Sequence, residues 1–201
     1  MTARGRPRQY DADKALEAAM RLFWSQGLTG TSLDELAAAT GMNRPSLYNA
    51  FGNKQAIYRR ALQRFVDRMG EAPVSRLDRR ADIAAALLDF YYAALDIYFD
   101  APQPNGCFVF CTAAPEAVSH PEIRADLRAV IRQVDGILEG RLHRAEAEGQ
   151  LAAGTSPRTL AAMSQALLHS LAIRARAGES RRGLRRFARE SVAALFGRAG
   201  A

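Results

Sequence analysis

Cysteine and histidine are scarce in this sequence: its 201 residues include two cysteines and three histidines. Two cysteines are too few for a disulfide framework, and they are typical of a chain that works in a reducing compartment. Cys107 and Cys111, taken with His120, have neither the number nor the spacing of ligands that a zinc site needs. We therefore expect no metal site and no cofactor.

Long apolar runs are also missing. No run reaches the length of about 20 residues that crosses a bilayer. Residues 1–9 are basic and lack the apolar core of a secretory signal. The sequence therefore predicts a cytoplasmic protein without a membrane partner.

Common enzyme motifs are not found either. The sequence has no nucleophile elbow, no phosphate-binding loop and no HExxH motif. His120, His143 and His169 lie far apart in the chain. An α-helical enzyme whose residues converge in space is an alternative that nothing in the sequence favours, and we predict that the protein is not an enzyme.

The apolar residues follow the period of an α-helix almost throughout, and no alternating strand pattern is convincing. This pattern predicts an all-α fold, with helices over about residues 11–26, 32–40, 43–51, 53–68, 82–100, 107–118, 121–149, 157–177 and 181–196. Glycine and proline interrupt the pattern over 70–78. We therefore predict an N-terminal domain over residues 1–68 and a larger C-terminal helical domain over 69–201.

Positive charge is concentrated in the first third of the chain. Residues 1–68 contain 11 Lys and Arg against 6 Asp and Glu, whereas the remaining residues contain 17 against 15. A basic terminal segment favours a polyanionic partner, most often nucleic acid, although a solvated basic face is an equally simple interpretation.

Residues 33–52 have the pattern of a helix-turn-helix. Ser32 and Glu35 have the spacing of a capping box, and Gly41 is placed to turn the chain between two helices. Asn43 is a favourable cap for the second of these helices. A small residue and several apolar residues stand where the two helices must touch: Leu36, Ala37, Met42, Leu47 and Ala50.

The second helix of this motif exposes side chains suited to DNA. Arg44 can bond a guanine edge or a phosphate, and Asn49 can bond an adenine edge or a phosphate. The Tyr48 hydroxyl suits a phosphate oxygen, although its ring could instead be part of the core. The predicted DNA contacts here are Asn43, Arg44, Pro45, Ser46, Tyr48, Asn49 and Lys54. A protein that coats DNA without sequence preference is an alternative that such a helix disfavours.

The stretch "TSLDELAAATGMNRPSLYNAFGNKQAIYRRAL" resembles the DNA-binding domain of the TetR family of bacterial transcriptional regulators. The resemblance covers about residues 10–65 and adds Thr31 to the predicted DNA contacts, while Pro45 stands where many members have a small residue. The resemblance implies an all-helical homodimer that binds a palindromic operator in double-stranded DNA. It also implies release of that operator when a small molecule, unknown here, binds a variable C-terminal domain.

A basic arm precedes the first predicted helix. Arg4 and Arg6 could follow the phosphate backbone or enter a minor groove, as arms of this kind do. The alternative is a solvated tail.

The C-terminal two thirds are less informative about a ligand. Candidates for a pocket lining are Tyr91, Tyr98, Cys107, Phe108, Cys111 and His169, with ordinary core packing as the alternative for each. Cys107 and Cys111 are four residues apart and would share one helix face. A second hypothesis is therefore a redox or electrophile sensor, in which a helix N-terminus lowers the pKa of the Cys107 thiol. Two buried, small apolar side chains are the alternative.

The last two predicted helices have apolar stripes. The family resemblance implies that such a pair forms a four-helix interface with a second copy of the chain. The candidate interface residues are Leu160, Met163, Leu167, Leu171, Leu184, Phe187, Val192 and Leu195. Packing within the single chain is the alternative.

Overall fold

The computed structural model describes residues 11–100 and 104–197. Over these residues it contains helices and no strand, which confirms the predicted all-α fold. Among the helices of these ranges, none is both long and apolar enough to cross a membrane. The chain forms two compact units, one ending at Arg64 and one beginning at Phe65, and each is described by itself.

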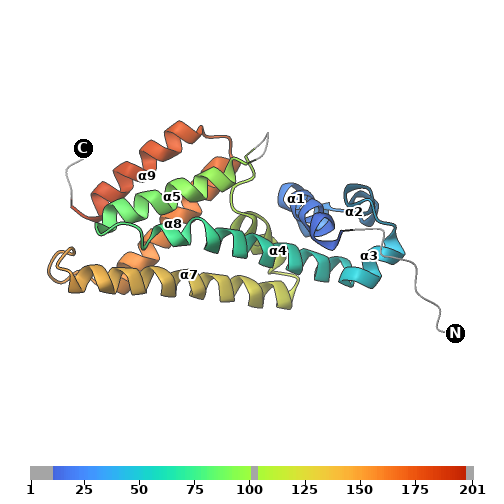
Figure 1. Cartoon of the computed structure of the whole chain (residues 1–201), viewed down its shortest axis with the longest axis horizontal. Helices are drawn as coiled ribbons and strands as arrows, with labels where there is room; N and C mark the ends of the chain where they lie inside the picture. The colour runs from blue at the N-terminus through green and yellow to red at the C-terminus, as the bar shows by residue number, and fades with distance from the viewer. Residues whose placement is uncertain (1–10, 101–103, 198–201) are drawn as a thin grey trace. The chain divides into compact units, whose positions relative to one another are not determined.

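The first unit contains α1 (Ala12–Gly30), α2 (Leu33–Thr40), α3 (Arg44–Phe51) and the first part of α4 (Lys54–Glu71) (Figure 1). Asp11 caps α1 by accepting hydrogen bonds from two backbone N–H groups of its first turn. These helices lie within a few residues of the ranges that periodicity predicts, because their ends are marked by local capping residues.

A break near the end of α1 separates its long first part from the last turn. The sequence predicts a left-handed cap at Gly27, and the structure has the positive φ of 76° but an extended ψ of 179°. This region of backbone conformation is open almost only to glycine. The chain therefore bends sharply here before it reaches α2.

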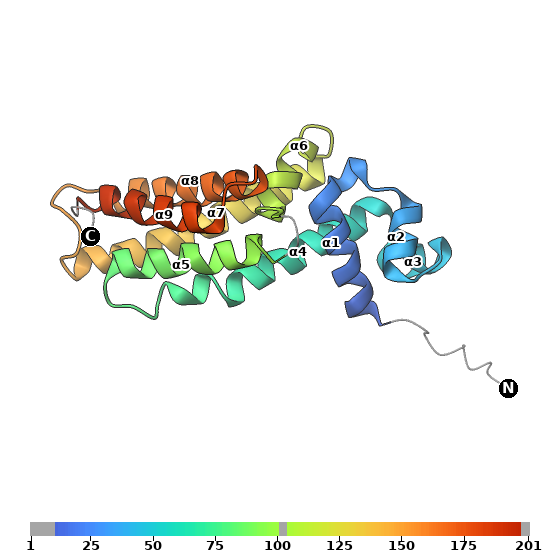
Figure 2. The same ribbon diagram turned by 90° about the horizontal axis from the view of Figure 1, so that it is seen from above.

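The second unit contains the end of α4, η1 (Val74–Arg76), α5 (Ile83–Tyr98), η2 (Val109–Ala113), α6 (Ala114–Glu116), α7 (Pro121–Ala147), α8 (Pro157–Arg176) and α9 (Arg181–Leu195). The helix α8 packs against α5, α7 and α9, and α5 also packs against α9 (Figures 1 and 2). The side chains between these helices form the core of the unit.

The segment predicted as a helix over 107–118 has a different form. It consists of the π-helical turn η2 followed by the short α6. Gly106, with a φ of 65°, lies so close to the Ala172 carbonyl of α8 that a Cβ atom would collide with it. Because π-helical turns are rare and are frequently found at functional sites, this segment is a place to look for a functional site.

A buried arginine fixes the loop between η1 and α5. Arg141 of α7 is 5% exposed and donates hydrogen bonds to the carbonyl oxygens of Leu77, Arg80 and Ala81, at 2.9, 3.1 and 2.9 Å. The sequence pattern does not reveal this role, because Arg141 and its partners are about 60 residues apart in the chain.

Candidate nucleic-acid interface and ligand pocket

The turn between α2 and α3 has the geometry of a helix-turn-helix. The Ser32 hydroxyl accepts from the Glu35 N–H at 3.2 Å, and the Glu35 carboxylate accepts from the Ser32 N–H at 2.8 Å, which completes the predicted capping box. These hydrogen bonds to Ser32 lower the pKa of Glu35. Gly41 then ends α2 in the left-handed region, with φ 66° and ψ 19°. A glycine is needed there because other residues adopt this conformation at a cost.

The orientation of α3 is set by its buried face and its cap. Leu47 and Phe51 are 0% and 5% exposed, and Leu36 of α2 is also fully buried. The Asn43 side chain accepts from the Ser46 N–H at 2.8 Å, so Asn43 is the predicted cap. Its carbonyl oxygen is therefore already used within the protein, and its amide N–H groups are the donors that remain for DNA.

The opposite face of α3 points to solvent and carries the predicted contacts. Arg44, Pro45 and Asn49 are exposed, and the Tyr48 side chain is 45% exposed. Ser46 is half-buried beside them. The alternative of a core position for Tyr48 is therefore wrong. The exposed face is polar and basic, and the buried face is apolar.

Asp34 of α2 is the immediate partner of Arg44. The guanidinium donates to one carboxylate oxygen from Nε at 2.9 Å and lies 2.6 Å from it at Nη2. This contact raises the pKa of Arg44, so the side chain is a permanent cation at the leading edge of α3.

Two of the predicted DNA contacts have structural roles in the first unit. Thr31 is 1% exposed, and its hydroxyl donates to the Gly27 carbonyl at 2.7 Å. The Lys54 ammonium donates to the carbonyls of Leu28 and Thr31 at 2.9 and 2.8 Å. The prediction for the Thr31 side chain is wrong because its buried hydroxyl caps the bend at the end of α1. Two of the three N–H groups of Lys54 hold the same bend, and the third leaves its contact with a phosphate as a prediction.

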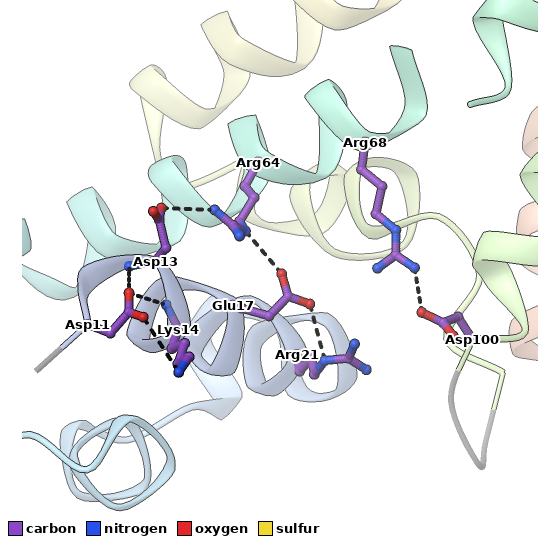
Figure 3. Close-up of polar contacts among 8 residues, drawn as sticks. All are labelled: Asp11, Asp13, Lys14, Glu17, Arg21, Arg64, Arg68 and Asp100. Carbon is purple, nitrogen blue, oxygen red and sulfur yellow. Dashed lines mark hydrogen bonds and ion pairs between the residues drawn. The ribbon is translucent and has the colours of Figure 1, made fainter. Parts of the chain in front are cut away.

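An ion-pair cluster joins α1 to α4 within the first unit. Arg64 of α4 contacts Glu17 at 3.0 Å and Asp13 at 3.4 Å, and Glu17 also pairs with Arg21 at 3.2 Å (Figure 3). These pairs raise the pKa of Arg64, chiefly through its hydrogen bond to Glu17. The predicted contacts Arg4 and Arg6 lie outside the described residues.

A short helix with a buried apolar face and an exposed polar face that carries Arg44, held by a glycine turn and two caps, defines the class of this protein: it is a helix-turn-helix DNA-binding protein. Residues 15–61 match the family model described as bacterial regulatory proteins, tetR family, and residues 84–191 match the one described as tetracyclin repressor-like, C-terminal domain. The chain therefore belongs to the TetR family of transcriptional regulators.

Known relatives agree with this assignment. The HTH-type transcriptional repressor ComR of Escherichia coli (strain K12) is 30% identical over 179 residues, which cover 89% of this chain and 85% of ComR. A solved structure of a triple-cysteine mutant of the TetR family regulator CifR, in complex with 26-bp operator DNA, is 30% identical with a TM-score of 0.86. It covers 94% of this chain and 99% of that one. A regulator from Chloroflexus aurantiacus, 20% identical with a TM-score of 0.82, covers 93% of this chain and 94% of its own and supports the fold.

The second unit contains an apolar pocket of about 60 Å³. Its walls come from α4, η1, η2, α7 and α8, and of the six predicted pocket residues Cys107 lines it. Tyr91, Tyr98 and Phe108 are fully buried in the core, and the Tyr91 hydroxyl donates to the Ser164 carbonyl at 2.9 Å. The core alternative is therefore the correct one for these three aromatic residues.

Two further pocket candidates, His169 and Cys111, do not line this pocket. The His169 ring packs on Phe110, with centroids 3.7 Å apart, and Phe110 lines the pocket in its place. The Cys111 sulfur lies 3.9 Å from the Ala172 carbonyl. The sequence did not predict the pocket residues of α4 and α7. The helix period predicts which face of a helix is buried, but it does not show between which helices a pocket remains.

The thiols have the opposite electrostatic character from the one predicted. Burial raises the pKa of the Cys107 thiol to about 12, and it also raises the pKa of Cys111, although Arg176 opposes that shift. A helix N-terminus does not lower the pKa of Cys107, because desolvation of the thiolate outweighs any favourable dipole.

Most of the predicted dimer residues are buried within the single chain. Leu171 and Leu184 are 0% exposed and Val192 is 1% exposed, and Leu160 and Leu167 are 6% and 8% exposed. These five predictions are corrected, because the side chains already pack in the core of the second unit. Met163 is 49% exposed, whereas Phe187 and Leu195 are half-buried. Ile173 of α8, which was not predicted, is 59% exposed.

Proposed function

We propose that α3 enters the major groove of an operator and reads its sequence as part of a transcriptional repressor. The observation that carries this proposal is the division of α3 into two faces. Leu47 and Phe51 are buried and fix the helix, whereas Arg44, Tyr48 and Asn49 face solvent. A major groove about 12 Å wide accepts a helix presented in this way.

The exposed residues suit different parts of DNA. Arg44 matches the paired acceptors of guanine, and Asn49 matches the donor and acceptor of adenine. Pro45 can contact a thymine methyl group, and the Ser46 and Tyr48 hydroxyls can bond phosphates. The arm with Arg4 and Arg6 is proposed to add contacts to the backbone or the minor groove.

The protein is proposed to act as a homodimer on a palindromic operator. Met163 and Ile173 are exposed apolar side chains on α8, and a second copy would cover them. A two-fold axis through this face would present two copies of α3, so the operator would be a palindrome whose half-sites match their separation. Because its proposed partner is chromosomal DNA, the protein is proposed to work in the cytoplasm, and no catalytic role is proposed for it.

Release of the operator is proposed to follow the binding of a small molecule in the second unit. The relatives support the operator-binding part of the proposal: ComR is a repressor, and the CifR mutant binds operator DNA with its cysteines replaced. A second candidate is release by an electrophile, which the position of Cys107 in the pocket wall favours. The thiol pKa of about 12 opposes it, since the thiolate is the nucleophile.

Selection of random duplex DNA by the purified chain, followed by footprinting, tests the DNA-binding proposal. We expect a palindrome, and we expect Arg44→Ala to weaken binding to it about 10- to 100-fold. Arg128→Ala is the matched control, because Arg128 is an exposed arginine on α7 of the second unit. The proposal would be overturned if the selection enriched no DNA sequence and if the affinity of both variants for DNA fell equally with rising salt concentration.

A further inference from the structure

The pocket of the second unit carries an inference about the effector, which rests on the proposed function because that function needs an effector. Its deepest residues, Phe65, Cys107 and Leu168, are each at most 2% exposed. Its rim includes Val134 and Ile137 of α7, which are half-buried. The pocket therefore has a buried floor and a partly exposed mouth.

Charge is missing from this lining. In the part of the chain that the structure describes, no Asp, Glu, Lys, Arg or His side chain lines the pocket. The polar groups of the lining are the Gln133 amide at the exposed mouth and the protonated Cys107 thiol in the floor. An ionised ligand would lose its hydration here without gaining an opposite charge. An uncharged ligand would lose little and would gain close contacts with the walls.

The geometry points to a small, uncharged and mostly apolar organic molecule as the effector, with its polar group at Gln133. The volume of about 60 Å³ is less than half of the roughly 150 Å³ at which an engineered cavity binds benzene. Scaled from the six non-hydrogen atoms of benzene, the pocket holds about two or three, so a ligand with about five, such as isobutanol, needs the flexible Met69 to turn aside. A protein partner would need roughly 800 Å² of its surface buried, far more than this pocket offers.

The position of the pocket gives such a ligand access to α4. Phe65, Val66 and Met69 line the pocket, and all three belong to this helix. The same helix begins at Lys54, and its residues up to Arg64 belong to the unit that carries α3. Occupancy of the pocket therefore acts on a helix that continues into the DNA-contacting unit.

Saturation-transfer NMR on the full-length chain tests this assignment with three probes that share one carbon skeleton: isobutanol, isobutyrate and isobutylammonium. We expect transfer to isobutanol and none to the two ions. Val134→Phe and Ile137→Phe fill the mouth from two positions, and each should reduce the isobutanol signal at least about fivefold. Val118→Phe is the matched control, because Val118 is 77% exposed and does not line the pocket.

The outcomes separate this inference from the function on which it rests. Equal transfer to the ions would overturn the assignment, and so would parent-like binding by both mouth variants. If the chain selects an operator but binds no isobutanol, the assignment fails and the proposed function stands. If it binds isobutanol in the pocket but selects no operator, the proposed function fails and the pocket chemistry stands.

Discussion

Asp34 on α2 holds Arg44 on α3 through a single carboxylate oxygen, which lies 2.9 Å from Nε and 2.6 Å from Nη2. The arginine proposed to read the operator is therefore oriented in the absence of DNA. Both side chains are more than half exposed, so the pair fixes a direction more than it adds stability. A residue of the first helix of the motif thus positions a residue of the second.

Asp34→Ala should reduce sequence discrimination more than binding itself. Without the carboxylate, Arg44 loses more side-chain entropy when it meets a base edge, while contacts with phosphates gain from the loss of a negative charge. We expect the ratio of specific to non-specific affinity to fall about three- to tenfold. Competition titrations measure this ratio, with the exposed Asp78→Ala as the control. An unchanged ratio would show that Asp34 does not orient Arg44.

Thr31 and Lys54 should act on stability. Thr31→Val removes the hydrogen bond to Gly27 and should lower the free energy of unfolding by about 1 kcal/mol, whereas Thr31→Ser keeps the hydroxyl and should lose less. Lys54→Met removes two bonds to carbonyls and should cost about 2–3 kcal/mol. Urea unfolding measures both. Lys54→Met could instead leave stability intact and reduce the slope of the logarithm of DNA affinity against the logarithm of salt concentration by about one. That result would show that the Lys54 side chain binds a phosphate.

Arg141→Met should be among the most damaging single substitutions in the second unit. It leaves three carbonyl oxygens without their donor, and we expect a loss of about 2–4 kcal/mol in the free energy of unfolding. Arg128→Met changes the same residue type on the exposed face of α7 and should cost less than about 0.5 kcal/mol. Thermal and urea denaturation compare the two, and equal losses would contradict an anchoring role for Arg141.

The Cys107 thiol should make the protein less stable in alkali. Its pKa is about 12 in the folded chain against an ordinary value of 9.0, so the folded state holds the proton more tightly than the unfolded state. Its contribution is complete below pH 9 and is lost as the pH rises from 9 towards 12. Between pH 8 and 10, unfolding free energies of Cys107→Ala should fall less steeply than those of the parent chain. Parallel curves would show that the thiol is accessible, which would revive the electrophile hypothesis.

The helix-turn-helix could be predicted because its signals are local. Ser32, Glu35, Gly41 and Asn43 act within three or four residues of themselves, and each has the capping or turning role that its chemistry predicts. The same reasoning did not reveal the carbonyl partners of Lys54, which lie 26 and 23 residues earlier in the chain. A basic residue at the start of a helix suits a phosphate and a carbonyl equally well, so only the fold distinguishes them.

The second unit shows a different limit. Leu171 and Leu184 belong to apolar stripes. Such a stripe predicts that its side chains are buried, but it does not show whether the same chain or a second copy covers them. Met163 and Ile173 differ from them only in that no element of the described protomer covers them fully. The thiol prediction failed for a related reason, since the spacing of Cys107 and Cys111 carries no information about desolvation.

The cluster of Arg64 with Glu17 and Asp13 has a mechanical consequence. It ties α4 to α1, while Lys54 ties α4 to the bend before α2, and Arg60 donates to the Ala50 carbonyl of α3 at 3.3 Å. Each of the other three helices or their junctions is thus fastened to α4 within the first unit. Within the first unit, a displacement of α4 would therefore carry α1, α2 and α3 with it and leave the geometry of the helix-turn-helix unchanged.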